Sequence, residues 1–181
     1  MQPFFRLVLF AYALVIHYAA GQDDWRSGQD GSVPCNAFVG TLDKGKPVYV
    51  ARAALNGGLL PGKLVSRLGQ AYIPFNDKEY KVSSYDVLCN SRSYSWEFFS
   101  ISVQRSPVPF PASLFFNSDP PPVRVPSNAV VGGYSAVHKD NLYICKVGSS
   151  IGKVHLRHKA CFYPYGGKEG NSKIFDLLVR D

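Results

Sequence analysis

Sequence patterns that mark common enzymes and nucleic-acid-binding proteins are missing from this 181-residue chain. It holds no nucleophile-elbow, zinc-protease or phosphate-loop motif, which argues against those classes of enzyme. The formal net charge is +7, but the basic residues are scattered, whereas nucleic-acid-binding proteins normally gather theirs on one face. No asparagine begins the Asn-x-Ser/Thr pattern that directs N-glycosylation. We therefore expect neither an enzyme nor a nucleic-acid partner.

Long apolar runs are also missing, except at the amino terminus. A short basic start that ends at Arg6 precedes an apolar run over residues 7–20, which closes in the small residues Ala19, Ala20 and Gly21. This order is typical of a secretory signal peptide, so we predict that residues 1–21 are removed and that the mature protein is secreted. A membrane anchor is the alternative, although the run is shorter than the about 20 residues that a span needs.

The most informative feature of the sequence is that part of it occurs twice. Residues 62–88 and 152–178 align without a gap, and the likeness continues upstream with small gaps. Similarity at so many fixed offsets indicates a duplicated supersecondary unit. It predicts a first repeat at 22–89, a Pro/Ser-rich connecting insertion at 90–126 and a second repeat at 127–181. The identical pairs are Gly62/Gly152, Lys63/Lys153, Arg67/Arg157, Pro74/Pro164, Lys78/Lys168, Glu79/Glu169, Asp86/Asp176 and Leu88/Leu178.

Each repeat favours β-strands. Short runs rich in β-branched and aromatic residues are bounded by turn-forming residues, and the two-residue turns at 76–77 and 166–167 are of the types that hairpins prefer. Pro74 and Pro164 lack an amide donor and should lie at a strand edge or a bulge. The Lys-Glu pairs at 78–79 and 168–169 should pin the hairpins. No segment shows a helical period. We predict an all-β fold of two pseudo-symmetric antiparallel modules, about four strands each, arranged as a sandwich or barrel.

The connecting insertion separates Trp96 from its repeat. Trp25 lies 11 positions before Asn36 at the head of the first repeat, whereas Trp96, which should take the same place in the second, lies 32 positions before Asn128. The extra residues fall within 99–125. We interpret them as a surface loop, with an extended partner-binding segment or a retained stretch of transcript as alternatives.

Four cysteines, Cys35, Cys89, Cys145 and Cys161, lie beyond the predicted signal peptide. An even number in a secreted chain indicates disulfides. The last two correspond to alanines in the first repeat, as expected of small facing positions on neighbouring strands, while the first two stand at the start and end of the first repeat. We predict the bridges Cys35–Cys89 and Cys145–Cys161, with unpaired buried thiols as the alternative.

The ordered motifs PVYVARA, PGKLV, YIPF-x-x-KE and SYDVL, followed by NAVVGGY, LYICKV, IGKV, CFYPYGGKE and FDLL, resemble the tandem DM-nine repeat family, also called the natterin-like repeat. The resemblance covers roughly residues 25–180 apart from the insertion. It implies a small β-protein of paired repeats that acts as a mannose-binding lectin in innate immune recognition. In such lectins the sugar lies near an acidic residue of the first hairpin and the lysine of a Pro-Gly-Lys motif.

Carried over to this sequence, the resemblance places ligand-binding residues at Asp43 and Lys63 in the first repeat and at Asp140 and Lys153 in the second. A carboxylate that accepts and an ammonium that donates can hold two neighbouring sugar hydroxyls. The second repeat departs from the family pattern, because its hairpin is two residues longer and Ile151 stands where proline is expected. As an alternative, the lysines simply follow glycines that form turns.

The leading prediction is a secreted carbohydrate-binding protein of innate recognition, with a homodimer as one way to link sites and gain avidity. The alternative is a secreted structural or venom/salivary-type protein with the same fold and no sugar site. We expect no cofactor and no metal. His155 and His158 form a His-x-x-His pair, but on a strand these two side chains would point to opposite faces.

Overall fold

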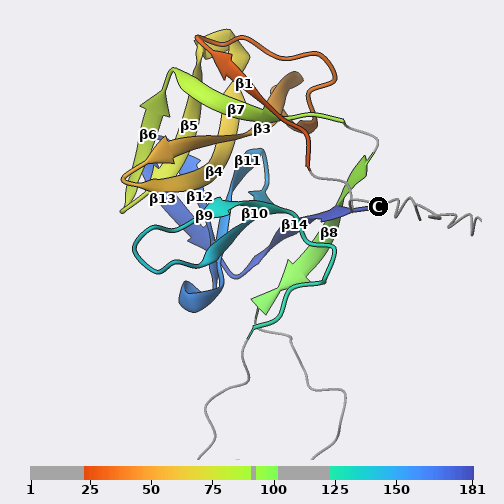
Figure 1. Ribbon diagram of the computed structural model, residues 1–181, viewed down its shortest axis with the longest axis vertical. Helices are drawn as coiled ribbons and strands as arrows, with labels where there is room; N and C mark the ends of the chain where they lie inside the picture. Colours follow the sequence, from red (N-terminus) through yellow and green to blue (C-terminus); the bar gives the residue numbers. More distant parts are fainter. Residues whose placement is uncertain (1–22, 91–92, 102–122) are drawn as a thin grey trace, which may run out of the picture.

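A computed structural model describes residues 23–90, 93–101 and 123–181 of the chain. The predicted signal peptide and residues 102–122 of the predicted insertion lie outside them. The described residues form one antiparallel sheet of 14 strands (Figure 1), which confirms the predicted all-β fold. The first repeat contains β1 (Trp25–Gln29), β2 (Val39–Asp43), β3 (Lys46–Leu55), β4 (Gly58–Val65), the 3₁₀-helix η1 (Ser66–Leu68), β5 (Gln70–Phe75), β6 (Lys78–Val82) and β7 (Ser84–Leu88). The second contains β8 (Tyr94–Ser100), β9 (Val131–Tyr134), β10 (Asn141–Val147), β11 (Ser150–His155), the 3₁₀-helix η5 (Leu156–His158), β12 (Ala160–Tyr165), β13 (Lys168–Ser172) and β14 (Ile174–Arg180).

The two repeats have the same strand order, so the predicted duplication is confirmed. The sheet runs β1-β7-β3-β4-β5-β6-β13-β12-β11-β10-β14-β8 and reads the same from either end once each strand is replaced by its counterpart. Each repeat supplies seven strands rather than the predicted four or so. The strands missing from the prediction include β4 and β11, and in β11 every residue is buried, among them the polar Ser150, Lys153 and His155.

Strand β8 overturns the predicted start of the second repeat. Tyr94–Ser100 falls inside the predicted insertion, yet it pairs with β14 along its whole length and, in Figure 1, lies beside it at the edge of the second repeat. Trp96 pairs with Leu178 just as Trp25 pairs with Leu88, so the predicted equivalence of the two tryptophans is confirmed. Structurally, the second repeat therefore begins at β8, and what separates β8 from β9 interrupts this repeat instead of connecting the two.

Eight of the strands close into a barrel to which both repeats contribute. The ring runs β4-β5-β6-β13-β12-β11-β10-β9 and returns to β4. The repeats meet where Lys78 pairs with Lys168 and where Leu59 pairs with Tyr134. Residues from either repeat therefore face one shared interior, and a site formed inside the ring belongs to neither repeat alone.

Apolar packing across the joint holds the two repeats together. One core cluster draws on both halves, and its fully buried aliphatic side chains each contribute about 1.5–3 kcal/mol of stability. The members of this cluster are Phe38, Val48, Val50, Leu88, Tyr94, Val130, Ile144, Ile151 and Leu178, with Trp25 and Trp96 packed against them.

Among the described residues, no helix is both long and apolar enough to cross a membrane.

The glycine of each Gly-Lys pair is required by close strand packing and not by a turn. A Cβ added to Gly62 would lie 2.2 Å from the carbonyl oxygen of Tyr72, and one added to Gly152 would lie 1.9 Å from that of Phe162. Both distances are far below van der Waals contact, so only glycine fits. The alternative in which these glycines form turns is wrong, because they lie inside β4 and β11.

The hairpins follow the prediction closely. The turn between β5 and β6 has positive φ at Asn76 and Asp77, and the turn between β12 and β13 has positive φ at both glycines. Residue Pro74 lies inside the sheet order, but its part of β5 is paired only with β6, because the ladder to β4 ends at Tyr72. The missing amide donor is thus tolerated at a local edge, and its counterpart on β12 is placed likewise.

The structure confirms one predicted disulfide. Cys145 and Cys161 are bonded, and their Cα atoms are 6.1 Å apart. They do not lie on directly neighbouring strands as expected. Cys145 is on β10 and Cys161 on β12, and β11 runs between these strands. The sheet curves strongly enough to bring the two flanking strands together, and the equivalent positions of the first repeat, Ala51 and Ala71, are likewise fully buried.

The predicted Cys35–Cys89 bridge is wrong: both residues are free thiols. Cys89 is fully buried, and its backbone forms an isolated β-bridge with that of Ala37. Cys35, two residues before Ala37, lies in a turn closed by a hydrogen bond from the Ala37 amide to the Pro34 carbonyl oxygen. This turn leaves Cys35 exposed, so the position that faces Cys89 is taken by an alanine.

Candidate functional site

A cavity of about 330 Å³ lies where the two repeats share the barrel. Its walls combine aromatic rings with ionisable side chains, and they come from both repeats: β4, β5 and the β5–β6 turn on one side, and β10–β13 with the β9–β10 loop on the other. Such a mixture of apolar walls and a few polar groups is typical of small-molecule sites. The lining residues are Leu60, Phe75, Asn76, Asp77, Ser135, Val137, His138, Leu142, Lys153, His155, His158, Phe162 and Glu169.

Lys153 is the one predicted ligand-binding residue that lines this cavity. Its ammonium donates to the Pro74 carbonyl oxygen of the first repeat and, over 2.8 Å, to the Glu169 carboxylate. Two rings flank it, since Nζ lies 5.7 Å from the ring centroid of Phe75 and 5.8 Å from that of Phe162. Burial lowers the pKa of Lys153, opposed by the charge and hydrogen bond of Glu169. An ammonium has three donors, so one donor remains beyond these two hydrogen bonds.

The first repeat has a similar arrangement around Lys63. Lys63 donates to the Pro164 carbonyl oxygen of the second repeat over 2.8 Å and to Ser150 Oγ over 3.1 Å. The Glu79 carboxylate is 4.0 Å from Nζ. Burial lowers the pKa of Lys63, opposed by Glu79 and then by Asp43. Lys63 does not line the cavity, and its two hydrogen bonds join the two repeats.

The two glutamates fix the hairpins of the opposite repeat. Glu79 accepts a hydrogen bond from the amide of Gly167 over 2.7 Å, and Glu169 accepts one from the amide of Asp77 over 3.0 Å. The expectation that the Lys-Glu pairs pin the hairpins is therefore confirmed for the glutamates, with the addition that each pins its neighbour's hairpin.

The predicted acidic partners pair with arginines and not with the lysines. Asp43 accepts a hydrogen bond from Arg67 over 2.6 Å, and Asp140 accepts one from Arg157 over 3.0 Å. This hydrogen bond lowers the pKa of Asp140. In both repeats the predicted acid thus forms its ion pair with an arginine. The sequence held a signal for this, because Arg67 and Arg157 match between the repeats.

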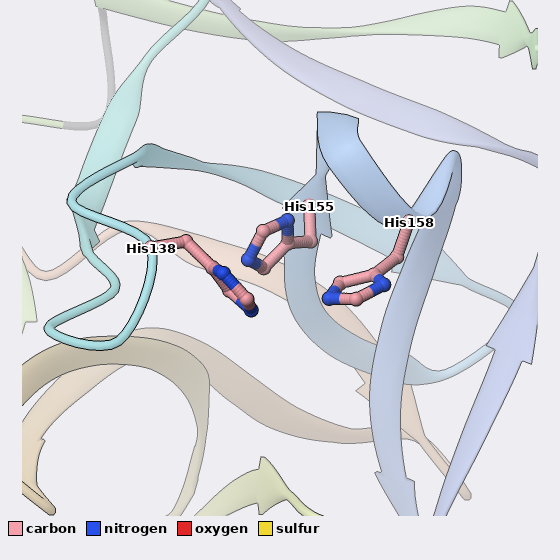
Figure 2. A group of neighbouring side chains, drawn as sticks. All are labelled: His138, His155 and His158. Carbon is pink, nitrogen blue, oxygen red and sulfur yellow. The ribbon is translucent and has the colours of Figure 1, made fainter.

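Three histidines form one cluster on the cavity wall. His138 comes from the β9–β10 loop, His155 ends β11 and His158 ends η5, and Figure 2 shows their imidazoles side by side. Each offers one ring nitrogen within 4.8 Å of those of the other two. The centroids of the His155 and His158 rings are 4.4 Å apart, and those of His138 and His155 are 5.1 Å apart. These are the side chains of the cavity best suited to hold a transition metal.

The expectation that His155 and His158 point to opposite faces is wrong. The strand ends at His155, and the next three residues form a 3₁₀-helix. This turn brings His158 back beside His155, so the centroids of the two imidazoles lie 4.4 Å apart. His138 joins them from the hairpin that is two residues longer than its counterpart in the first repeat. Sequence reasoning missed it because this loop is far from β11 along the chain.

His155 is neutral at physiological pH and should make folding pH-dependent. It is only 5% exposed, and neither ring nitrogen has a hydrogen-bond partner among the described residues. Burial, followed by the charges of His158 and His138, lowers its pKa to about 4, with Asp140 opposing and Lys153 adding slightly. In the unfolded chain a histidine titrates near 6.5, so between pH 6.5 and 4 the unfolded state binds more protons than the folded state. Stability from this group is therefore present above about pH 6.5 and is lost as the pH falls toward 4.

The variant His155→Val tests this dependence, because valine stands at the equivalent position of the first repeat. We expect urea denaturation of the unmodified protein to lose stability between pH 6.5 and 4 more steeply than that of the variant. Carboxylates titrate in both proteins and cancel in the comparison. Parallel pH profiles would contradict the assignment.

Fold and site together define a two-repeat β-protein with a ligand-sized cavity between its repeats. The DM9 repeat model matches the chain twice in tandem, at residues 42–110 and 116–172. This chain belongs to the DM9 repeat family, as its motifs predict. Each matched segment begins part-way through a structural repeat, since the first starts within β2 and the second starts after β8.

Two similar proteins show how far the likeness extends. Natterin-4 of Thalassophryne nattereri is 41% identical over 56 residues, which are 30% of this chain and 14% of that protein. The crystal structure of the nematode sperm cell motility protein MFP2B superposes with a TM-score of 0.55 at 18% identity, over 88% of this chain and 46% of that one. The second likeness shows the fold alone. The chain spans a small part of the length of the first relative and under half of the second.

Proposed function

We propose that this chain is a secreted carbohydrate-binding protein that recognises mannose-type glycans on microbial surfaces, with the cavity around Lys153 as its sugar site and no catalytic activity. The observation that carries the proposal is the convergence of the Lys153 ammonium and the Glu169 carboxylate on one cavity wall, between two aromatic rings. Sugars present vicinal hydroxyls that both donate and accept, together with an apolar face. The cavity offers a charged donor, a charged acceptor and rings for these features.

The size of the cavity supports a small ligand. Its volume of about 330 Å³ lies at the lower end of the roughly 300–1,000 Å³ that small-molecule sites span, which suits one sugar residue better than a long chain. The buried Cys145–Cys161 disulfide supports an extracellular location, because such bonds form and persist in oxidising compartments. Two chains in a homodimer would present two cavities and gain avidity for a repeated glycan.

The alternative, a secreted structural or venom/salivary-type protein with this fold and no sugar site, is favoured by one observation. The hydrogen bonds from Lys63 to Ser150 and Pro164 join the two repeats, and Asp43 pairs with Arg67. In the first repeat the predicted ligand-binding residues thus serve the fold.

A matched pair of variants tests the proposal. Glu169→Gln and Glu79→Gln make the same change at equivalent positions, and both side chains are only 8% exposed. A glycan array first identifies the preferred sugar among mannose-type glycans. We then expect the affinity for that sugar, measured by calorimetry, to weaken about tenfold or more in Glu169→Gln. A hydrogen bond to a charged group contributes about 1.5–3 kcal/mol. Glu79→Gln should bind as the unmodified protein does.

Thermal unfolding of both variants provides the control for folding. If the unmodified protein binds no glycan, the structural alternative is favoured. Weaker binding in Glu79→Gln with unchanged binding in Glu169→Gln would move the sugar site to the first repeat, where Asp43→Asn then becomes the next variant to measure.

A further inference from the structure

We propose that His138, His155 and His158 form a binding site for a divalent transition metal ion of the zinc class on the wall of the cavity. This inference goes beyond the proposed function and does not depend on sugar binding. It rests on the convergence of the three imidazoles, on the unpartnered state of the buried one, and on a comparison of the two repeats.

The geometry is that of a three-ligand site. The candidate ligand nitrogens lie within 4.8 Å of one another. Tetrahedral zinc with Zn–N bonds of about 2.0–2.1 Å holds its nitrogens roughly 3.4 Å apart, so an ion would draw the rings inward by about 1 Å. Two of the rings are free to move, because His158 is exposed and His138 is half-buried on a loop. The third, on β11, is fixed by the barrel.

The buried ring carries the strongest signal. His155 is only 5% exposed, yet its Nδ1 and Nε2 atoms both lack hydrogen-bond partners in the described part of the chain. A buried polar group without a partner costs free energy, so such groups in native proteins call for an explanation. A metal ion supplies one, because it takes the lone pair of one ring nitrogen.

Ligand chemistry selects the class of ion. Three neutral imidazoles suit zinc, copper, nickel or cobalt, whereas calcium and magnesium prefer oxygen ligands. The nearest charged groups are already paired with each other: Asp140 with Arg157 and Lys153 with Glu169. Three protein ligands also leave one coordination position open, which in a zinc site is taken by water or by a bound molecule.

The first repeat shows that the fold does not need these histidines. Val65 and Leu68 stand at the positions equivalent to His155 and His158, at the end of the equivalent strand, β4, and of the equivalent 3₁₀-helix, η1. Two apolar residues therefore serve the architecture equally well. Apart from His17 in the predicted signal peptide, the chain has no histidine outside this cluster, so all the histidines of the mature protein meet at one place.

The test is a metal titration of the untagged secreted protein with Zn²⁺, and with Co²⁺ for its absorption spectrum. We expect one ion per chain, an absorption spectrum of a four-coordinate Co²⁺ site, and a higher melting temperature with Zn²⁺, because a ligand that binds only the folded state stabilises it. The double variant His155→Val/His158→Leu copies the first repeat. It should fold and lose binding at least 100-fold, and His138→Ala should lose about tenfold or more. Mg²⁺ should not compete.

Absence of saturable binding at one ion per chain would overturn the proposal, as would equal affinity in the unmodified protein and the double variant. Because the readout is metal binding by protein without sugar, its failure leaves the sugar proposal standing. Likewise Glu169→Gln, if it abolishes sugar binding, should still bind Zn²⁺.

Discussion

Replacing Lys153 by methionine should cost about 3–5 kcal/mol of folding free energy, the loss expected when one partner of a buried ion pair is removed. The side chains of Lys153 and Glu169 are only 7% and 8% exposed. Methionine would leave the Glu169 carboxylate buried with the Asp77 amide as its remaining partner, and it would leave the Pro74 carbonyl oxygen without its charged donor. Urea denaturation at pH 7 measures the loss.

The control is the same substitution at Lys146, whose ion pair with Asp176 is more exposed, at 19% and 39%. Its loss, with that of the contact of Lys146 with the Trp96 ring, should cost only about 1 kcal/mol. Adding Glu169→Gln to Lys153→Met removes the unpaired charge and should recover part of the stability. A cost for Lys153→Met no larger than that for Lys146→Met would show that the buried pair does not stabilise the joint between the repeats.

Replacing both Cys145 and Cys161 by alanine should lower the free energy of unfolding by about 3 kcal/mol. The bridge closes a loop of 16 residues in sequence separation, and the loss of such a cross-link frees the unfolded chain by about this amount. Alanine is the appropriate replacement, because buried alanines occupy both equivalent positions of the first repeat. The double variant should therefore keep the fold. Calorimetry and urea denaturation can measure the loss in its free energy of unfolding.

Replacing the exposed free thiol by Cys35→Ala provides the control, which should change stability by less than about 0.5 kcal/mol, as surface substitutions usually do. The unmodified protein should also lose stability under strong reductant, once denatured and refolded, to the level of the double variant. Equal stability of the double variant and the unmodified protein would mean that the disulfide adds nothing to a barrel already closed by its strands.

Local sequence signals predicted the elements that depend on local chemistry. The hairpin turns at 76–77 and 166–167 were predictable because only certain residues tolerate positive φ at both positions. The equivalence of Trp25 and Trp96 and the Cys145–Cys161 bridge followed from comparing the repeats, since duplicated positions share an environment. The Cys35–Cys89 prediction failed because the start and the end of a repeat need not bring their side chains face to face: Cys35 lies in an exposed turn.

The candidate site was only partly predictable for a similar reason. Lys153 was identified through the family resemblance, but no sequence pattern indicated that Glu169 and Phe162 share a cavity with residues of the first repeat. The histidine cluster was missed because the pair at 155 and 158 was assigned strand geometry, whereas a 3₁₀-helix begins after His155. A change from strand to helix over three residues leaves too few positions for any periodicity to reveal.

The sequence by itself determined that the chain is all-β, that it is duplicated, and which family it belongs to, because these properties are written in turn residues, strand-forming residues and repeated motifs. Only the tertiary structure decided that the repeats close one barrel together. That closure directs Lys63 and Lys153 each toward a carbonyl oxygen of the opposite repeat, and it brings His138 beside His155 and His158. These contacts depend on register between strands far apart in the chain, and long-range register depends on packing that no local pattern encodes.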